Sequence, residues 1–134
     1  MILVDSAVDR GCETDPVTAM RKLSLDALAR EQLEVARRAA PSRSARTVVG
    51  GHEAALRQTV VALLANAELD EHENLGEATV QVLRGRVELT ADVDRWEGRD
   101  GDLLVIPNAR HAVRALVDSV ILITAVPHAH HGQP

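Results

Sequence analysis

Aromatic residues are the most conspicuous shortage in this chain, which has no Tyr, no Phe and a single tryptophan, Trp96. Proteins that stack nucleic-acid bases or sugar rings normally use several aromatic side chains. Positive charge is also short, since the formal net charge is -5, which disfavours contact with nucleic acid or an anionic membrane surface. These shortages argue against nucleic acid and membrane lipid as partners.

Cysteine and long apolar runs are scarce as well. Cys12 is the only cysteine, so no internal disulfide can form, which is typical of proteins in a reducing cytoplasm. No segment approaches the roughly 20 apolar residues that cross a bilayer. The apolar start "MILVDSAVDRG" is interrupted by Asp5 and Asp9 and lacks the features of a signal peptide. We therefore expect a cytoplasmic protein without a membrane partner.

Aliphatic side chains are what the chain has in abundance, because hydrophobic residues make up 46% of its 134 residues. That is enough for the core of one domain. Residues 1–20 show no sustained periodicity and are expected to form an arm. The stretch "SLDALAREQLEVARRAAP" predicts a helix with Ser24 as its N-cap and Pro41 as its stop. Its apolar face must pack on the rest of the chain or on a second copy. The next stretch, "PSRSAR", would be a linker, so residues 21–46 are helix and linker.

From Thr47 onward the hydrophobic period is that of strands. Short runs that alternate or are rich in β-branched residues follow one another between turn signals: "TVV", "LRQTVVALL", "EATVQVL", "RVELTADV", "LLVIP", "RHAVRAL" and "VILITAV". The stretch "DRWEGRDGD" lies between two of these runs. About seven short strands predict an all-β sandwich or barrel over residues 47–126. A polar, histidine-rich tail follows over residues 127–134.

Two motifs in this region resemble those of the cupin family of small jelly-roll β-barrels. The family's first motif is H-x-H, three or four residues, E, six residues and G, and the corresponding residues here are His72, Asn74, Ala78 and Gly85. The second motif is G, five residues and P, followed soon by a histidine, and here these are Gly101, Pro107 and His111. The resemblance covers about residues 47–126. It implies an all-β fold, a cupin-like jelly-roll β-barrel with an N-terminal helix.

The resemblance also implies a metal site, of which this chain keeps half. In metal-binding cupins the two histidines and the glutamate of the first motif, with the histidine of the second, hold one ion inside the barrel. His72 and His111 remain, whereas Asn74 replaces one histidine and Ala78 replaces the glutamate. Transition metals usually take three or more protein ligands from imidazole and carboxylate. We therefore expect no cofactor, or a weakly bound divalent transition metal (Zn, Mn, Fe or Ni).

Two further residues are candidates for a missing ligand. His52 precedes the run "LRQTVVALL" and could approach the same cavity. Glu77 is one residue from the expected glutamate position, but alternation points it to the opposite face of its strand, so it would need a bulge. A plainer interpretation of His72 and His111 also stands, in which each histidine bonds a backbone carbonyl at the barrel mouth.

Three side chains outside the motifs have a functional and a structural interpretation. Trp96 could line a pocket, although its charged surroundings favour a half-exposed position in a hairpin. Arg57 and Arg114 lie in strand-like runs and could bind a carboxylate ligand inside the barrel. Solvated positions on the outer face are the favoured interpretation for both arginines.

These observations leave three functional hypotheses. The first is a module that binds a small molecule in an aliphatic cavity, with His72, Asn74 and His111 as polar contacts and no chemistry. The second is a small metal-dependent cupin enzyme of the oxygenase or isomerase type with an atypical histidine site. The third is a metal-free enzyme with His72 or His111 as general base. We also expect a homodimer, because small jelly rolls must cover their sheet edges and the helix has an apolar face.

Overall fold

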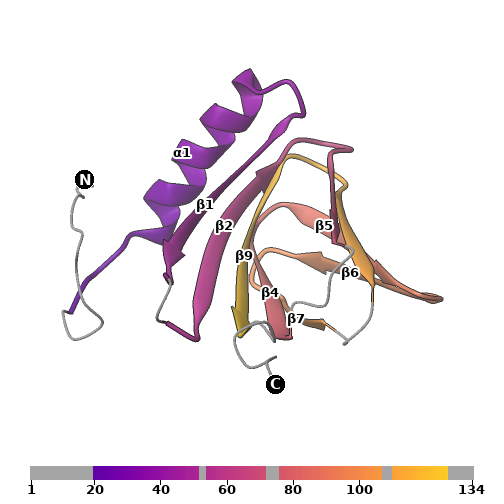
Figure 1. Ribbon diagram of the computed structural model, residues 1–134. Coiled ribbons are helices and arrows are strands. Elements are labelled where there is room, and N and C mark those ends of the chain that lie inside the picture. The colour runs from indigo at the N-terminus through magenta and orange to yellow at the C-terminus, as the bar shows by residue number, and fades with distance from the viewer. Residues whose placement is uncertain (1–19, 52–53, 72–75, 107–109, 127–134) are drawn as a thin grey trace.

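The computed structural model describes residues 20–51, 54–71, 76–106 and 110–126, with the side chain of Glu71 left undescribed. These residues form one helix and nine strands (Figure 1). In chain order the elements are α1 (Leu25–Arg38), β1 (Arg43–Val49), β2 (Arg57–Leu63), β3 (Glu68–Glu71), β4 (Glu77–Arg84), β5 (Arg86–Ala91), β6 (Asp94–Arg99), β7 (Leu103–Ile106), β8 (His111–Ala115) and β9 (Ser119–Val126).

The strands form two antiparallel sheets that enclose the main core. The five-stranded sheet has the order β1-β2-β9-β4-β7, and the four-stranded sheet has the order β3-β8-β5-β6. Short connections link β2 to β3, β4 to β5, β6 to β7 and β8 to β9, so each link joins one sheet to the other. The prediction of an all-β fold with an N-terminal helix is confirmed.

The helix begins where the sequence predicts and ends at Arg38, three residues before the predicted stop at Pro41. Ser24 is the N-cap, and its hydroxyl oxygen accepts a hydrogen bond from the Ala27 N–H at 3.1 Å. The helix packs on the outer face of the five-stranded sheet through a second hydrophobic cluster, whose buried members are Leu28, Ala29, Leu33, Ala36, Val60, Ala62, Val120 and Leu122. The apolar face is therefore covered within the chain, and it is no longer a reason to expect a second copy. Within the described residues, no helix has the length and apolarity needed to cross a membrane.

Three strands lie wholly or partly where the sequence did not predict them. β1 begins at Arg43, inside the predicted linker, β3 occupies Glu68–Glu71 between two predicted runs, and β6 occupies Asp94–Arg99 within "DRWEGRDGD". All three are edge strands, and most of the side chains of β1 and β6 are exposed. An edge strand is held by backbone hydrogen bonds on one side only, so it needs no hydrophobic alternation. That is why the sequence pattern missed them.

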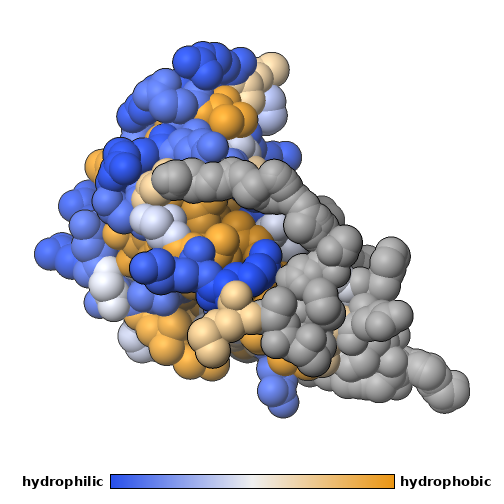
Figure 2. Space-filling model, turned by 90° about the vertical axis from the view of Figure 1, so that its left-hand side faces the viewer, coloured by the Kyte–Doolittle hydropathy of each residue, from blue (hydrophilic) through white to orange (hydrophobic). Residues whose placement is uncertain are grey.

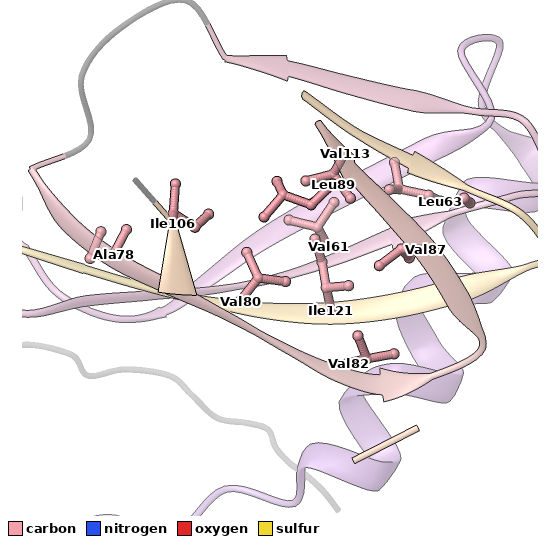
Figure 3. Close-up of a cluster of buried hydrophobic side chains, with 12 residues drawn as sticks. Val61, Leu63, Ala78, Val80, Val82, Val87, Leu89, Ile106, Val113 and Ile121 are labelled. Atoms are coloured by element: carbon pink, nitrogen blue, oxygen red, sulfur yellow. The ribbon is translucent and has the colours of Figure 1, made fainter. Parts of the chain in front are cut away.

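The main core lies between the two sheets (Figure 3). Strand β4 supplies Ala78, Val80 and Val82, which alternate with partly or fully exposed neighbours and are buried in this core. The sequence predicted these three residues on the inner face, and the structure agrees. The other fully described strands add mainly valine, leucine and isoleucine: Val61, Leu63, Val87, Leu89, Ile106, Val113 and Ile121.

Candidate functional site

One end of the barrel is closed by tight, hydrogen-bonded turns. Gly85, in the β4–β5 turn, has φ +96°, and its N–H donates to Asp100 Oδ1 in the β6–β7 turn at 2.7 Å. In the β8–β9 turn, Asp118 Oδ1 accepts from the N–H of Ala65, in the β2–β3 connection, at 2.9 Å. Gly101, with φ +89°, donates its N–H to the Val82 carbonyl at 2.8 Å. The glycines of both cupin-like motifs thus fill positions where the backbone requires positive φ.

We call the opposite end the open end, because the β1–β2 and β3–β4 connections there are longer than any connection at the closed end. The segments that join β1 to β2, β3 to β4 and β7 to β8 all connect strand ends on this side, as the register of these strands requires. His52, His72 and Asn74 belong to such segments and lie outside the described residues. Glu71, which immediately precedes His72, is paired in register with His111. Of the candidate histidines, His111 is described, and it lies at this end of the barrel.

The five-stranded sheet ends here in a row of one arginine, two alanines and one isoleucine. Four residues on adjacent strands are in direct register across its inner face: Arg57, Ala125, Ala78 and Ile106. The last three belong to the buried core. Figure 3 shows Ala78 and Ile106 at one end of that core, away from Leu63 and Val87. The side chains lining the inner face thus become smaller toward the open end along β4 and β9.

The four-stranded sheet ends in a second row at the same end. His111 opens β8 and is paired with Glu71 on one side and Ala91 on the other. Its side chain is 5% exposed and shares the inner face with Val113 and Ala115. Since β8 follows the inner-face alternation without a break, His111 lies inside the barrel, beside the small side chain of Ala91. Asp94, paired with Ala91, ends the row on the edge strand and is exposed.

The donor atoms in the described part of this end do not fit a transition-metal site. Ala78 is 6% exposed on the inner face and offers no donor at the position of the family's glutamate. Glu77 is exposed on the other face of β4, in register with Val126, with no bulge that would turn it inward. Among the described residues there is no cluster of three or more His, Cys, Asp or Glu side chains that could hold a metal. At the four positions of the family's ligand motif, this chain has two imidazoles, His72 and His111, where three ligands are usual.

The structure separates the two arginines that the sequence analysis treated alike. Arg114 is exposed on the outer face of the four-stranded sheet, and its guanidinium lies 3.4 Å from the Glu88 carboxylate. The predicted outer-face position is thus confirmed for Arg114. For Arg57 it is wrong, because Arg57 has the same strand parity as Val61 and Leu63, which are in the main core. Counting alternate residues back from these two would have revealed its face.

Trp96 lies on the inner side of edge strand β6, opposite the buried Leu89 in the register. Its side chain is 65% exposed, because β6 has a neighbour on one side only. The sequence analysis favoured a half-exposed hairpin residue, which matches this position. Along β6, Trp96 lies two residues further from the open end than Asp94. It is the only tryptophan of the chain, which has no tyrosine, so its fluorescence reports on this position alone.

Comparisons with solved structures agree on the fold. A Cupin 2 conserved barrel domain protein from Salinispora arenicola superposes with a TM-score of 0.61 at 21% identity, over 83% of this chain and 92% of that chain. A conserved protein of unknown function from Streptococcus pyogenes gives 0.59 at 28% identity, over 66% of this chain and 77% of that chain. Salicylate 1,2-dioxygenase from Pseudoaminobacter salicylatoxidans gives 0.62 at 21% identity, over 76% of this chain and 31% of that chain.

Sequence comparisons add no further assignment. No family model matches the chain, and no curated protein matches it. The resemblance to the cupin family, drawn from two short motifs, is therefore confirmed by structural similarity at the level of the fold. Cupin barrels carry unrelated functions, so the fold does not assign one.

Proposed function

We propose that this cupin-fold protein binds a small molecule at the open end of its barrel and that its metal site is a remnant. One observation carries the proposal: buried Ala78 stands on the inner face where the family's motif has a glutamate, at the same end as buried His111. An imidazole without the carboxylate that would complete a site is suited to hydrogen bonding. In this proposal His111, with His72 and Asn74, makes the polar contacts to the ligand.

The size of the side chains at the open end supports binding of an apolar ligand body. Ala78, Ala91 and Ala125 lie in the last inner rows beside Ile106 and His111, whereas Val82 and Ile121 lie deeper in the barrel. Short side chains leave the ends of the two sheets lined with methyl groups. A compact hydrocarbon portion of a ligand can gain roughly 25 cal/mol for each Å² of apolar surface that it buries there.

Metal content tests the proposal directly. Protein purified without chelator or added metal should carry well below one transition-metal ion per chain. The double variant Asn74→His, Ala78→Glu should bind Mn, Ni or Zn near one per chain, and its melting temperature should rise with added metal by linkage. Without metal it should melt below the wild type, because a carboxylate is then buried among apolar side chains. Neither single variant should bind metal stably.

A matched control tests whether metal binding requires the carboxylate on the inner face of β4, or only an added charge. Thr79 is the next residue of β4, with the opposite strand parity. Asn74→His combined with Thr79→Glu adds the same two groups but places the carboxylate on the outer face, so it should bind no more metal than Asn74→His alone. If wild-type protein already holds one ion per chain tightly, the remnant-site proposal is wrong. A metal-dependent oxygenase or isomerase with an atypical histidine site would then be the better hypothesis.

Cytoplasmic location and a homodimer remain parts of this proposal. The single cysteine supports the first. The second is supported by β7, an edge strand whose Leu103 and Val105 are exposed on the outer face of the five-stranded sheet. Figure 2 shows hydrophobic residues gathered at the centre of the face it views, bordered by hydrophilic ones. Apolar surface of this kind is typical of contact sites.

A further inference from the structure

We infer that the ligand of the open end carries a carboxylate and that Arg57 is its ionic anchor. This inference rests on the proposed function, because it names the class of molecule that the same site would bind. It depends on three features of Arg57: its face, its lack of an ion-pair partner and its apolar neighbours.

The face of Arg57 follows from the register of the strand that it opens. β2 pairs with β9 without a break from Arg57 through Leu63, so strand alternation holds over the whole element. Val61 and Leu63 point into the main core, and Val60 and Ala62 point to the helix. Arg57 has the parity of the first pair. The exposed side chain of Arg57 therefore leaves the strand on the inner face of the sheet and not on the helix side.

The charge of Arg57 has no counterpart in the described structure. Three arginines of the four-stranded sheet behave differently, since Arg86 pairs with Glu97 at 3.0 Å, and Arg95 and Arg114 share Glu88 at 3.6 and 3.4 Å. No carboxylate of the described residues lies within ion-pair distance of Arg57. A guanidinium has a permanent charge and a planar fork of donors, which matches a carboxylate in a bidentate pair.

The neighbours of Arg57 define the rest of the ligand. The residues next in the row are Ala125, Ala78 and Ile106, all buried and apolar. Adjacent strands lie roughly 4.8 Å apart, so the apolar part of the row begins about 5 Å from the backbone of Arg57 and extends over about 10 Å more. A compact monocarboxylate with a short aliphatic or monocyclic body has this division of charge and hydrocarbon. A single guanidinium, without further donors among its row neighbours, suits a monoanion better than a phosphate.

Matched pairs of acid and amide test the inference. The probes are hexanoate with hexanamide, benzoate with benzamide, and cyclohexanecarboxylate with its amide. Within each pair the body is the same and only the charge differs. Binding is measured by calorimetry and by the emission of Trp96, which lies on the inner side of β6. For at least one pair, the wild-type protein should bind the acid about tenfold or more tightly than the amide, as for hydrogen bonds to charged groups.

Variants assign the preference to Arg57. Arg57→Gln should bring acid and amide to nearly equal affinity, and Arg57→Lys should restore part of the preference, because it keeps the charge but not the fork. Arg99→Gln is the matched control. Arg99 is also an exposed strand arginine without an ion pair in the described structure, but it lies near the closed end and has the outward parity of β6. Arg99→Gln should keep the wild-type preference.

The possible results separate this inference from the proposed function. If amides bind wild-type protein as well as acids do, or if Arg57→Gln keeps the preference for the acid, the carboxylate inference is wrong while small-molecule binding stands. If no probe of any pair binds at millimolar concentration, both are contradicted. Equal melting temperatures of Arg57→Gln and wild type would show that the change acts on binding and not on folding.

Discussion

The two ends of the barrel are built from different kinds of residue. At the closed end, turn residues from four connections bond to one another: Gly85 to Asp100, Asp118 to Ala65, and Ser119 to Arg86 and Val117. Helix α1 is fastened to this end too, since Asp26 pairs with Arg84 at 3.0 Å and Arg37 lies 3.8 Å from Asp118. At the open end, the last inner rows hold alanines, Ile106, one buried histidine and an arginine without an ion pair in the described structure.

This difference suggests a division of roles along the barrel axis, with the closed end stabilising the fold and the open end binding a ligand. Close packing and satisfied turn hydrogen bonds stabilise the closed end. Substitutions there should therefore lower the free energy of unfolding most. At the open end, the small side chains and the titratable groups should contribute less to stability. In our proposal these residues serve ligand binding. If this division is right, the same kind of substitution should have unequal effects at the two ends.

The largest effect is expected at Gly85. A Cβ added there would lie 2.7 Å from the carbonyl oxygen of Asp118 and closer still to the hydroxyl oxygen of Ser119, on a backbone with φ +96°. Gly85→Ala combines strain at positive φ with overpacking, so it should lower the free energy of unfolding by roughly 4 kcal/mol. Urea titration followed by Trp96 emission measures the loss.

Gly101→Ala is the control for the contribution of φ alone. Gly101 has φ +89°, and a Cβ there would meet no atom within 4 Å. Its cost should be about 1 kcal/mol, from backbone strain without a steric clash. Equal losses in the two alanine variants would contradict the claim that the closed end is tightly packed around Gly85.

The next effect compares one truncation at both ends. Ile121→Ala removes a fully buried side chain from the middle of the main core and should cost about 3 kcal/mol. Ile106→Ala makes the same change beside Ala78 at the open end and should cost about half as much, because fewer buried contacts are lost there. Thermal and urea unfolding of both variants give the ratio. A larger loss for Ile106→Ala would reverse the proposed division.

The smallest effect concerns the ion pairs that fasten the helix. The hydrogen bond from Arg84 lowers the pKa of Asp26 below its ordinary value of 3.8, and Arg30 adds to this shift. A carboxyl group with a lowered pKa stabilises the fold above its unfolded pKa and loses that contribution as the pH falls through the folded value. Asp26→Asn should therefore melt slightly below wild type at pH 7, and the two should converge below pH 4.

Salt offers an independent check of the same pair. Asp26 is exposed, so its interactions should be screened in about 1 M salt. Melting temperatures of Asp26→Asn and wild type should be measured across pH at low and at high salt. The difference between them should disappear both at low pH and at high salt. A difference between Asp26→Asn and wild type that persists at low pH or in high salt would mean that the residue acts through packing or helix capping and not through charge.

Local periodicity was enough to predict several parts of the molecule from the sequence. The helix could be read from its apolar spacing, Ser24 and Pro41, because helix formation depends on neighbours within a few residues. The inner face of β4 followed from the alternation of Ala78, Val80 and Val82. The two motif glycines marked turns, since a backbone with positive φ selects glycine wherever it occurs. The resemblance to the cupin motif, and not periodicity, placed Ala78 where that family has a glutamate.

Pairing between distant strands decided the rest, and no local pattern contains it. Edge strands β1 and β6 form because a neighbour offers its free backbone groups, so their exposed side chains carry little signal. The sequence by itself determined the class of the fold, and it has Asn74 and Ala78 where the family's motif has a histidine and a glutamate. Only the tertiary structure decided that Arg57 and Arg114 point to different sides, and that Arg57 shares a row with Ala125, Ala78 and Ile106. Register between strands far apart in the chain is set by the packing of the whole core, which is why such a row cannot be read from one strand at a time.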